Sequence, residues 1–433
     1  MAVSDTVRPL LAWLLLSAGS AAGAAPLTLI YSGNLDGELE PCGCTAETDY
    51  GGLSRRATYL DGLRADGLEP VVITTGGLLT AAIGADRIKA DFILSGLELL
   101  GYDAVGLQWS DLVYGPDFLA SHPLPYVASN WRDDAFPAAQ AVARGAIRLR
   151  LFQWLDPAGS VQNKMAGGKP EVDDDTAPLA AELAAARGRG ELTVLATTLP
   201  LDRAQATLPL DDVTILLLAT APEHPGPVQQ VGPMLVLTPG TRGMRLGRVD
   251  LEVAGDGSLQ SWEASVVELT NAVVDSPRLA TWYEAYNDAL RNDYLRQVEE
   301  RKARAAGTSP FIGSASCTVC HQSAAQAWQA SRHAGAIATL EAVGKAFDPN
   351  CVVCHSVGFG REGGYLGLDE TPDLANVQCE SCHGPGRAHV AAAGQAFPGK
   401  RTPREACADC HHPNHSPSFV FDAYWPRIVH GRD

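Results

Sequence analysis

Cys317-Thr-Val-Cys320-His321 opens the stretch of residues 317–411 that decides how the C-terminal part of this chain folds. The same pattern recurs as Cys351-Val-Val-Cys354-His355, Cys379-Glu-Ser-Cys382-His383 and Cys407-Ala-Asp-Cys410-His411. Each copy provides two thiols that can form thioethers with the vinyl groups of a porphyrin, and an imidazole that can ligate its iron. Paired cysteines can also bind zinc, but zinc does not require the histidine that follows every pair here. A disulfide framework is disfavoured, because a two-residue spacing rarely closes a long loop.

Four covalently bound c-type haems are therefore predicted, and they use eight of the ten cysteines. The predicted thioether residues are Cys317, Cys320, Cys351, Cys354, Cys379, Cys382, Cys407 and Cys410. The predicted proximal iron ligands are His321, His355, His383 and His411. This part of the chain has few aliphatic side chains, as expected if porphyrins form most of its interior.

The N-terminus has the pattern of a secretory signal peptide over residues 1–24. Arg8 precedes the apolar run Leu10–Leu16, and the small residues Ala22-Gly23-Ala24 form a cleavage site. The apolar run is shorter than the roughly 20 residues of a membrane span, and no cysteine for a lipid anchor follows it. We expect a periplasmic protein without a stable membrane span.

The chain has 433 residues and a formal net charge of −17. This length predicts two or three domains. The part from Ser309 onward has nearly balanced charge, with nine basic and eleven acidic residues, so most of the acidity lies before it. A nucleic-acid partner is therefore not expected.

Residues 27–265 show the pattern of an α/β domain. Apolar stretches predict strands, and amphipathic stretches between them predict helices that cover a sheet. The predicted strands are Leu27–Tyr31, Val71–Thr75, Leu192–Ala196, Val213–Leu218 and Met234–Thr238, and the predicted helices include Arg55–Leu63, Ala90–Leu100 and Ala177–Arg187.

We divide the mature chain into an α/β domain (25–275), a helical linker (276–308) and a mainly α multihaem cytochrome c domain (309–433). The linker begins with Ser276-Pro277 and carries an aromatic stripe that includes Trp282, Tyr286 and Tyr294. We expect one long helix that packs on the haem domain and acts as a semi-rigid connector.

The N-terminal part resembles the periplasmic 5′-nucleotidase metallophosphoesterases. The motifs that carry this resemblance are Tyr31-Ser-Gly-Asn-Leu-Asp-Gly37, Gly51-Gly-Leu-Ser-Arg-Arg-Ala57, Gly101-Tyr-Asp-Ala104, Val127-Ala-Ser-Asn130 and Gly243-Met-Arg-Leu-Gly-Arg-Val-Asp250. The resemblance implies a metallophosphatase-like sandwich of four layers.

The metal ligands of that family are replaced in this chain. The family's Asp-x-His pair corresponds to Asn34 and Asp36, its next aspartate to Gly77, and its Asn-His to Trp109-Ser110; the later metal-binding histidines correspond to Thr198 and to Ala219-Thr220-Ala221. Such enzymes use two metals about 3.5–4 Å apart. Before Ser309 the only histidines are His122 and His224, which we expect, with Asp36 and Asp103, to be solvated loop residues. We predict no dinuclear metal centre and no phosphoesterase activity.

Cys42 and Cys44 lie on the loop where that metal site would open. Two cysteines this close form only a strained disulfide, and strained disulfides are the redox-active kind. The alternatives of a redox pair, a tight turn without chemistry and an adventitious metal site stay open.

The C-terminal part resembles the cytochrome c-554 family. The resemblance rests on Phe311-Ile-Gly-Ser-Ala-Ser-Cys317, Trp328-Gln-Ala-Ser-Arg-His-Ala334, Asp348-Pro-Asn-Cys351, Val377-Gln-Cys-Glu-Ser-Cys-His-Gly-Pro-Gly386 and Tyr424-Trp-Pro-Arg-Ile-Val-His-Gly431. It implies that His333 is the distal ligand of the third haem and His389 that of the fourth. His430 or His415 would serve the first haem, while His412 would point away. The second haem would be five-coordinate, and any one of these histidines could instead bind a propionate.

Two functions follow from these patterns. One is electron transfer between periplasmic donor and acceptor proteins, whose docking surfaces would be basic because the N-terminal part is acidic. The other is an oxidoreductase that acts on a small nitrogen or sulfur compound at an open haem or at Cys42 and Cys44. We favour electron transfer, because no acid/base pair accompanies the second haem motif.

Overall fold

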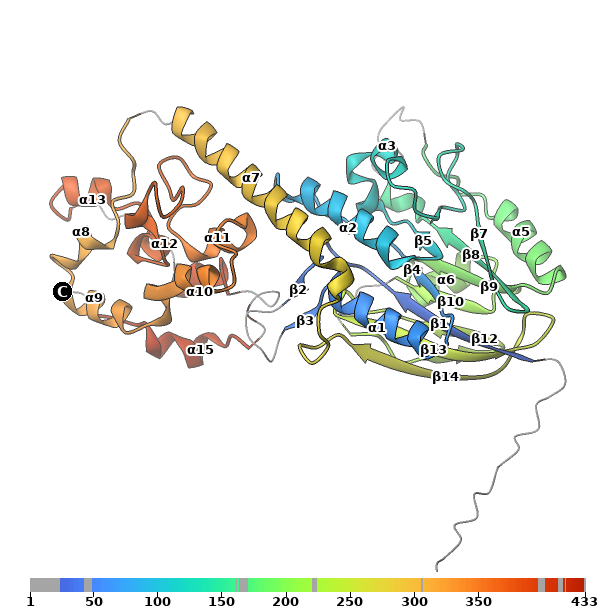
Figure 1. Cartoon of the computed structure of the whole chain (residues 1–433). Helices are drawn as coiled ribbons and strands as arrows, with labels where there is room; N and C mark the ends of the chain where they lie inside the picture. Colours follow the sequence, from blue (N-terminus) through green and yellow to red (C-terminus); the bar gives the residue numbers. More distant parts are fainter. Residues whose placement is uncertain are drawn as a thin grey trace, which may run out of the picture.

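The computed structural model describes residues 24–42, 49–160, 162, 170–219, 224–304, 307–395, 402–411, 416 and 418–431. The expected signal peptide lies almost wholly outside the described residues, as do Cys44, His412 and His415. Figure 1 shows an N-terminal α/β part and a C-terminal helical part, joined by one long helix. Within the described ranges, no helix combines the length and apolarity needed to cross a membrane.

The first sheet has the strand order β14-β13-β1-β4-β5-β6. Strands β1, β4, β5 and β6 are parallel, and the hairpin of β13 and β14 extends the sheet in antiparallel fashion. Their bounds are β1 Ala25–Ser32, β4 Val71–Thr74, β5 Ala104–Gly106, β6 Tyr126–Val127, β13 Arg245–Val253 and β14 Leu259–Glu268. The parallel strands end at one edge, where α/β folds place their functional loops.

The second sheet has the order β11-β12-β10-β9-β8-β7, with parallel strands between two antiparallel edge strands. Its strands are β7 Gln140–Arg144, β8 Ile147–Trp154, β9 Leu192–Thr197, β10 Ile215–Leu218, β11 Gln229–Val231 and β12 Met234–Leu237. A small pair, β2 Pro41–Cys42 and β3 Tyr50–Gly51, lies outside both sheets.

The two sheets stack face to face, and helices cover their outer faces. Alternation along β1 shows the arrangement: Leu29 and Tyr31 are buried between the sheets, whereas Ile30 packs under the helices. The first sheet is covered by α1 Leu53–Ala65 and α2 Asp86–Leu100, with the short α3 Pro116–Ala120 nearby; the second is covered by α5 Ala177–Gly188 and α6 Leu201–Thr207. The predicted four-layer α/β sandwich is confirmed.

All five predicted strands and all three predicted helices are present, with shifted ends. The strand predicted from Val213 begins at Ile215, and the helix predicted from Ala90 begins at Asp86. The antiparallel β13–β14 hairpin was not predicted. Most side chains of its outer strand, β14, are exposed or half-buried, so its sequence lacks a clean alternation of apolar and polar residues.

The connecting helix α7 spans Ala280–Arg304, after a short 3₁₀ turn at Pro277–Leu279. Its first half packs on α2: Trp282 and Tyr286 both contact Phe92 edge-on. Its second half packs on the C-terminal part, where the ring of Tyr294 stacks on Phe359 at 6.1 Å. We expected α7 to pack on the haem domain, but only its second half does so. Its first half, with Trp282 and Tyr286, packs on the N-terminal core.

The C-terminal part consists of short helices: α8 Ser314–Thr318, α9 Gln322–Gln329, α10 Ala336–Ala342, α11 Pro349–His355, α12 Cys379–His383, α13 Arg387–Ala391, α14 Pro403–Ala408 and α15 Phe421–Tyr424. In the described residues its apolar core is small, with Phe311, Val352 and Tyr365 among its eight buried members. Several valines, such as Val319 and Val353, are exposed. So small a core does not by itself account for a stable fold.

Candidate functional site

The loops at the carboxyl ends of β1, β4 and β5 meet where the metal site of a phosphoesterase would lie. Gln108 donates a hydrogen bond from Nε2 to Oδ1 of Asn34 (2.8 Å). The buried carboxylate of Asp111 accepts the backbone N–H groups of Gly77 (2.8 Å) and Leu78 (2.6 Å). Burial raises the pKa of Asp111 to about 6, and the backbone donors oppose this shift. Hydrogen bonds from side-chain amides and backbone groups connect these loops.

The backbone at Gly77 disfavours the aspartate of the family. Its φ is +72°, and a Cβ atom there would lie 2.4 Å from the side-chain amide carbon of Asn34. Trp109 donates a hydrogen bond from its ring N–H to the carbonyl of Asp156 (2.8 Å). Among the described residues, no group of three or more His, Cys, Asp and Glu could hold a metal ion.

The prediction of solvated loop residues was wrong for His122 and Asp103. His122 is buried, and its two ring nitrogens lie within hydrogen-bond distance of Glu98 (2.9 Å) and Asp91 (3.2 Å). Asp103 accepts from the backbone of Val72 (2.8 Å) and pairs with Arg144 (2.5 Å). Both residues tie helices or strands together, which a single sequence does not reveal. His224 and Asp36 are exposed, as expected.

The possible redox pair, Cys42 and Cys44, lies largely outside the described residues. The backbone of Cys42 belongs to β2 and pairs with Tyr50, but its side chain and the whole of Cys44 fall outside the described residues.

Each Cys-x-x-Cys-His motif forms a helical turn that gathers its functional groups. In the first motif the backbone N–H of His321 bonds to the carbonyl of Cys317 (3.0 Å), and His411 bonds to Cys407 in the same way (2.8 Å). The thiols of Cys317 and Cys379 shift each other's pKa in opposite directions, and those of Cys354 and Cys410 do the same, so the thiols of each pair are neighbours. The attachment points are therefore grouped in two pairs, first with third and second with fourth.

Three pairs of imidazoles face each other across the C-terminal part. The ring centroids of His321 and His389 are 6.1 Å apart, those of His333 and His411 6.1 Å, and those of His383 and His430 5.8 Å. An imidazole nitrogen binds a metal at about 2 Å, so two imidazoles on opposite sides of one metal have centroids about 6 Å apart. The three separations therefore fit one iron between each pair. Burial lowers the pKa of His333 and of His383, which favours the neutral imidazole that ligates iron.

These pairs differ from the expected assignments of the distal ligands. His333 faces the fourth proximal histidine, not the third, and His389 faces the first, not the fourth. His430 faces His383 of the third motif, whereas it was considered for the first. Distances along the chain could not decide the pairing, because each pair joins segments that meet only in the folded structure. His415 lies outside the described residues.

His355 of the second motif differs from the other three proximal histidines. Its Nδ1 lies 2.6 Å from the carbonyl oxygen of Ala336, so this nitrogen carries the proton and Nε2 is left to ligate iron. The other six described histidines of the C-terminal part pair among themselves. Within the described residues, no second imidazole is left for His355.

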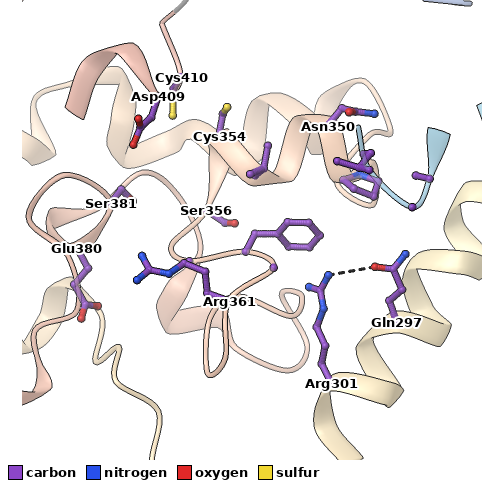
Figure 2. Close-up of a pocket in the computed structure, with 18 residues that line it drawn as sticks. Gln297, Arg301, Asn350, Cys354, Ser356, Arg361, Glu380, Ser381, Asp409 and Cys410 are labelled. Atoms are coloured by element: carbon purple, nitrogen blue, oxygen red, sulfur yellow. Dashed lines mark hydrogen bonds between the residues drawn. The ribbon is translucent and has the colours of Figure 1, made fainter. Parts of the chain in front are cut away.

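A cavity of about 750 Å³ adjoins the second and fourth motifs. Figure 2 shows Cys354 and Cys410 together on one side of it, and Arg301 of α7 hydrogen-bonded to Gln297 on another. Arg361 extends into the same space. The volume is in the range of pockets that hold cofactor-sized ligands. The thiols would attach a haem there, and the guanidinium groups would neutralise its propionates. The loop Ile83–Ala85 of the N-terminal part also lines this cavity.

Comparison with known proteins separates the chain into the same two parts. Residues 316–384 match the family model described as cytochrome c554 and c-prime. Cytochrome c-554 of Nitrosomonas europaea is 40% identical over 139 residues, which cover 24% of this chain and 59% of that protein.

Two solved structures share the fold of the N-terminal part. A 5′-nucleotidase precursor from Thermus thermophilus has a TM-score of 0.51 at 18% identity, over 61% of this chain and 59% of that one. A sulfate thiohydrolase from the same organism has a TM-score of 0.52 at 16% identity, over 66% and 63%. The chain thus spans less than two thirds of each of these proteins, and at these identities the structures show a shared fold alone.

Replacing His430 with alanine should convert one haem from low-spin to high-spin. The iron bound by His383 would then keep a single imidazole. Low-temperature EPR of the oxidised protein should show one high-spin haem in the wild type and two in His430→Ala. His224→Ala, which changes an exposed histidine of the N-terminal part, is the matched control and should leave the spectrum unchanged. An unchanged spectrum for His430→Ala would contradict the pairing of His383 with His430.

Proposed function

A cytochrome c-554-like C-terminal part is fused here to a 5′-nucleotidase-like metallophosphoesterase domain, and we propose that the chain is an exported tetrahaem cytochrome that transfers electrons. The proposed domains are residues 25–275, the linker 276–308 and the haem domain 309–433, after a signal peptide of 24 residues. Haem attachment outside the cytoplasm agrees with export to the periplasm.

The observation that carries this proposal is the set of three imidazole pairs about 6 Å apart, each with one member from a Cys-x-x-Cys-His motif. Two imidazoles give an iron a closed coordination shell, which suits electron transfer and not binding of substrate. The proximity of attachment thiols of the first and third motifs, and of the second and fourth, supports haems close enough to exchange electrons. When bound, the haems supply the one-electron chemistry; the protein holds and orients their iron.

We propose that the N-terminal domain is catalytically inactive and provides a docking surface. The ligand positions of a dinuclear site are occupied by Asn34, Gly77 and Trp109, whose contacts are described above. The part of the chain before Ser309 has 24 basic and 39 acidic residues. This excess of negative charge would attract a redox partner with a basic surface and speed its approach.

A second function is favoured by one specific observation: among the described histidines, none faces the imidazole of His355. An iron held by this histidine alone could bind a small molecule such as NO, and the protein would then act as an oxidoreductase on a nitrogen or sulfur compound. Steady-state turnover of nitrite, NO, hydroxylamine, tetrathionate or thiosulfate would favour this second function over electron transfer.

Four haems should be bound covalently to each chain. The pyridine haemochrome assay, referred to protein concentration, should give four haems that acidic acetone does not extract. Cys354→Ala should lower the content by one haem and destabilise the fold, since the small apolar core depends on the cofactor. Two haems per chain, or extractable haem, would contradict the proposal.

The purified protein should hydrolyse neither nucleotides nor bis-p-nitrophenyl phosphate, even with added manganese. The reason is the loss of metal ligands at Asn34, Gly77, Ser110 and Thr198. Assays with and without a chelator provide the control. Hydrolysis that the chelator abolishes would show that a metal site persists in this domain.

Electron transfer from the native donor should slow as ionic strength rises from low to physiological values. Salt shortens the range of attraction between the acidic domain and a basic partner to about 8 Å at 0.15 M. Stopped-flow rates measured at several salt concentrations test this expectation. A rate that does not depend on salt would remove the charged-docking role of the N-terminal domain.

A further inference from the structure

Residues 416 and 418–431 form an arm that folds back on the helix leading into the fourth haem motif. In this C-terminal arm, the ring of Phe421 lies under the guanidinium group of Arg404, which belongs to α14, at 4.2 Å. Arg404 also forms an ion pair with Asp422 (3.1 Å). Both charged side chains are largely exposed, so this ion pair contributes little to stability. The arm contacts the fourth motif more directly at its histidine.

Two side chains of the C-terminal arm contact the imidazole of His411. The hydroxyl oxygen of Ser416 lies 3.0 Å from Nδ1 of His411. The ring of Phe419 stacks on the imidazole, with the centroids 4.4 Å apart and the planes 13° apart. An iron bound at Nε2 leaves the proton on Nδ1, which then donates a hydrogen bond to the hydroxyl oxygen. The hydrogen bond and the stacked ring together oppose rotation of this imidazole about its bond to a metal.

The same arm carries the histidine that faces the third motif. The rings of Phe419 and Tyr424, the last residue of α15, have centroids 5.2 Å apart. The 3₁₀ turn Trp425–Arg427 follows α15 and leads to His430. The imidazole of His430 faces that of His383 at 5.8 Å. One segment therefore contacts the proximal histidine of the fourth motif and supplies the second imidazole of the third.

Packing in an apolar core does not explain the position of Phe419. As far as the chain is described, the core of the C-terminal part does not include this residue, and its side chain is only half-buried. Its ring contacts are to the imidazole of His411 and to the ring of Tyr424. A flat ring held parallel to an imidazole at this distance restricts the plane of the imidazole, which an aliphatic side chain does not do.

We propose that Phe419 and Ser416 are positioning residues for the haem of the fourth motif. Phe419 fixes the plane of the His411 imidazole, and Ser416 fixes the hydrogen bond at its Nδ1. Neither side chain binds the iron, and both act through its ligand. This inference rests on the proposed function, since it requires a haem at the fourth motif.

Two measurable properties of the fourth haem depend on these contacts. The planes of His333 and His411 make an angle of 47°, and the EPR g values of a low-spin ferric haem depend on the angle between its two imidazoles. A hydrogen bond donated from Nδ1 makes a ligating imidazole a stronger electron donor, which favours the ferric state. Loss of the Ser416 hydroxyl should therefore raise the reduction potential of this haem.

The role of Phe419 is tested by EPR of the oxidised holoprotein. Phe419→Leu keeps an apolar side chain but removes the flat ring, and it should shift the g values of one low-spin haem. Phe419→Tyr keeps the ring and should give the wild-type spectrum. Phe421→Leu is the matched control, because it makes the same change in the same arm on a ring that stacks on Trp425. It should leave the spectrum unchanged.

The role of Ser416 is tested by redox titrations monitored by EPR. His333→Ala removes the imidazole that faces His411, so the low-spin signal lost in this variant belongs to the fourth haem. The signal shifted in Phe419→Leu should be the same one. Ser416→Ala should raise the potential at which this signal disappears, and Ser416→Thr, which keeps a hydroxyl group, should restore it.

Haem content separates the two levels of the proposal. Fewer than four haems in the wild type would contradict the proposed function and this inference together. With four haems bound, wild-type g values in Phe419→Leu, or an equal shift in Phe421→Leu, would overturn the role of Phe419. An unchanged potential in Ser416→Ala would overturn the role of Ser416. Ser416→Ala removes a single oxygen atom, so it tests the contact with His411 even where Phe419→Leu loses haem.

Discussion

Facing pairs of imidazoles, each spaced to hold one iron, are the constraint on which the proposed haem domain depends. Each pair joins remote segments: His321 meets His389, and His333 meets His411. Closing loops of this length costs conformational entropy, and the few buried apolar side chains around Val352 and Tyr365 do little to offset it. Metal binding that requires two distant ligands stabilises the folded chain directly. Apolar side chains that are exposed here, such as Val353, lie on the same helix as the thiols and would pack against a porphyrin.

In the N-terminal domain, hydrogen bonds connect the loops where a metallophosphoesterase would hold its metals. Metals would have neutralised and connected the loops after β1, β4 and β5. In this chain the amide of Gln108 binds Asn34, and the carboxylate of Asp111 joins the loops after β4 and β5 through the backbone of Gly77, Leu78 and Gln108. A buried donor left without an acceptor costs about 1–3 kcal/mol. Asp111 therefore helps to hold these loops together by accepting their backbone N–H groups.

The sequence allowed correct prediction of features with a local cause. Strands such as β10 are apolar throughout, and the four Cys-x-x-Cys-His motifs specify their own chemistry. It did not allow prediction of features that depend on which segments meet. The distal partners of His321 and His411 are of this kind, and so is the burial of His122 between two carboxylates. The hairpin of β13 and β14 was missed for another reason, since an edge strand with many exposed side chains has a weak pattern. The contact between the two parts was not predicted either, because the sequence indicated only a helix that links them.

The N-terminal domain anchors the segment that leads into the second Cys-x-x-Cys-His motif. Lys345 binds Glu40 and lies over the rings of Tyr283 and Tyr286, and Phe347 packs against the N-terminal core. Ile83–Ala85, from the loop after β4, line the cavity beside the second motif. A reduction potential depends on burial, on hydrogen bonds and on nearby charge, and the N-terminal domain supplies part of each to this motif.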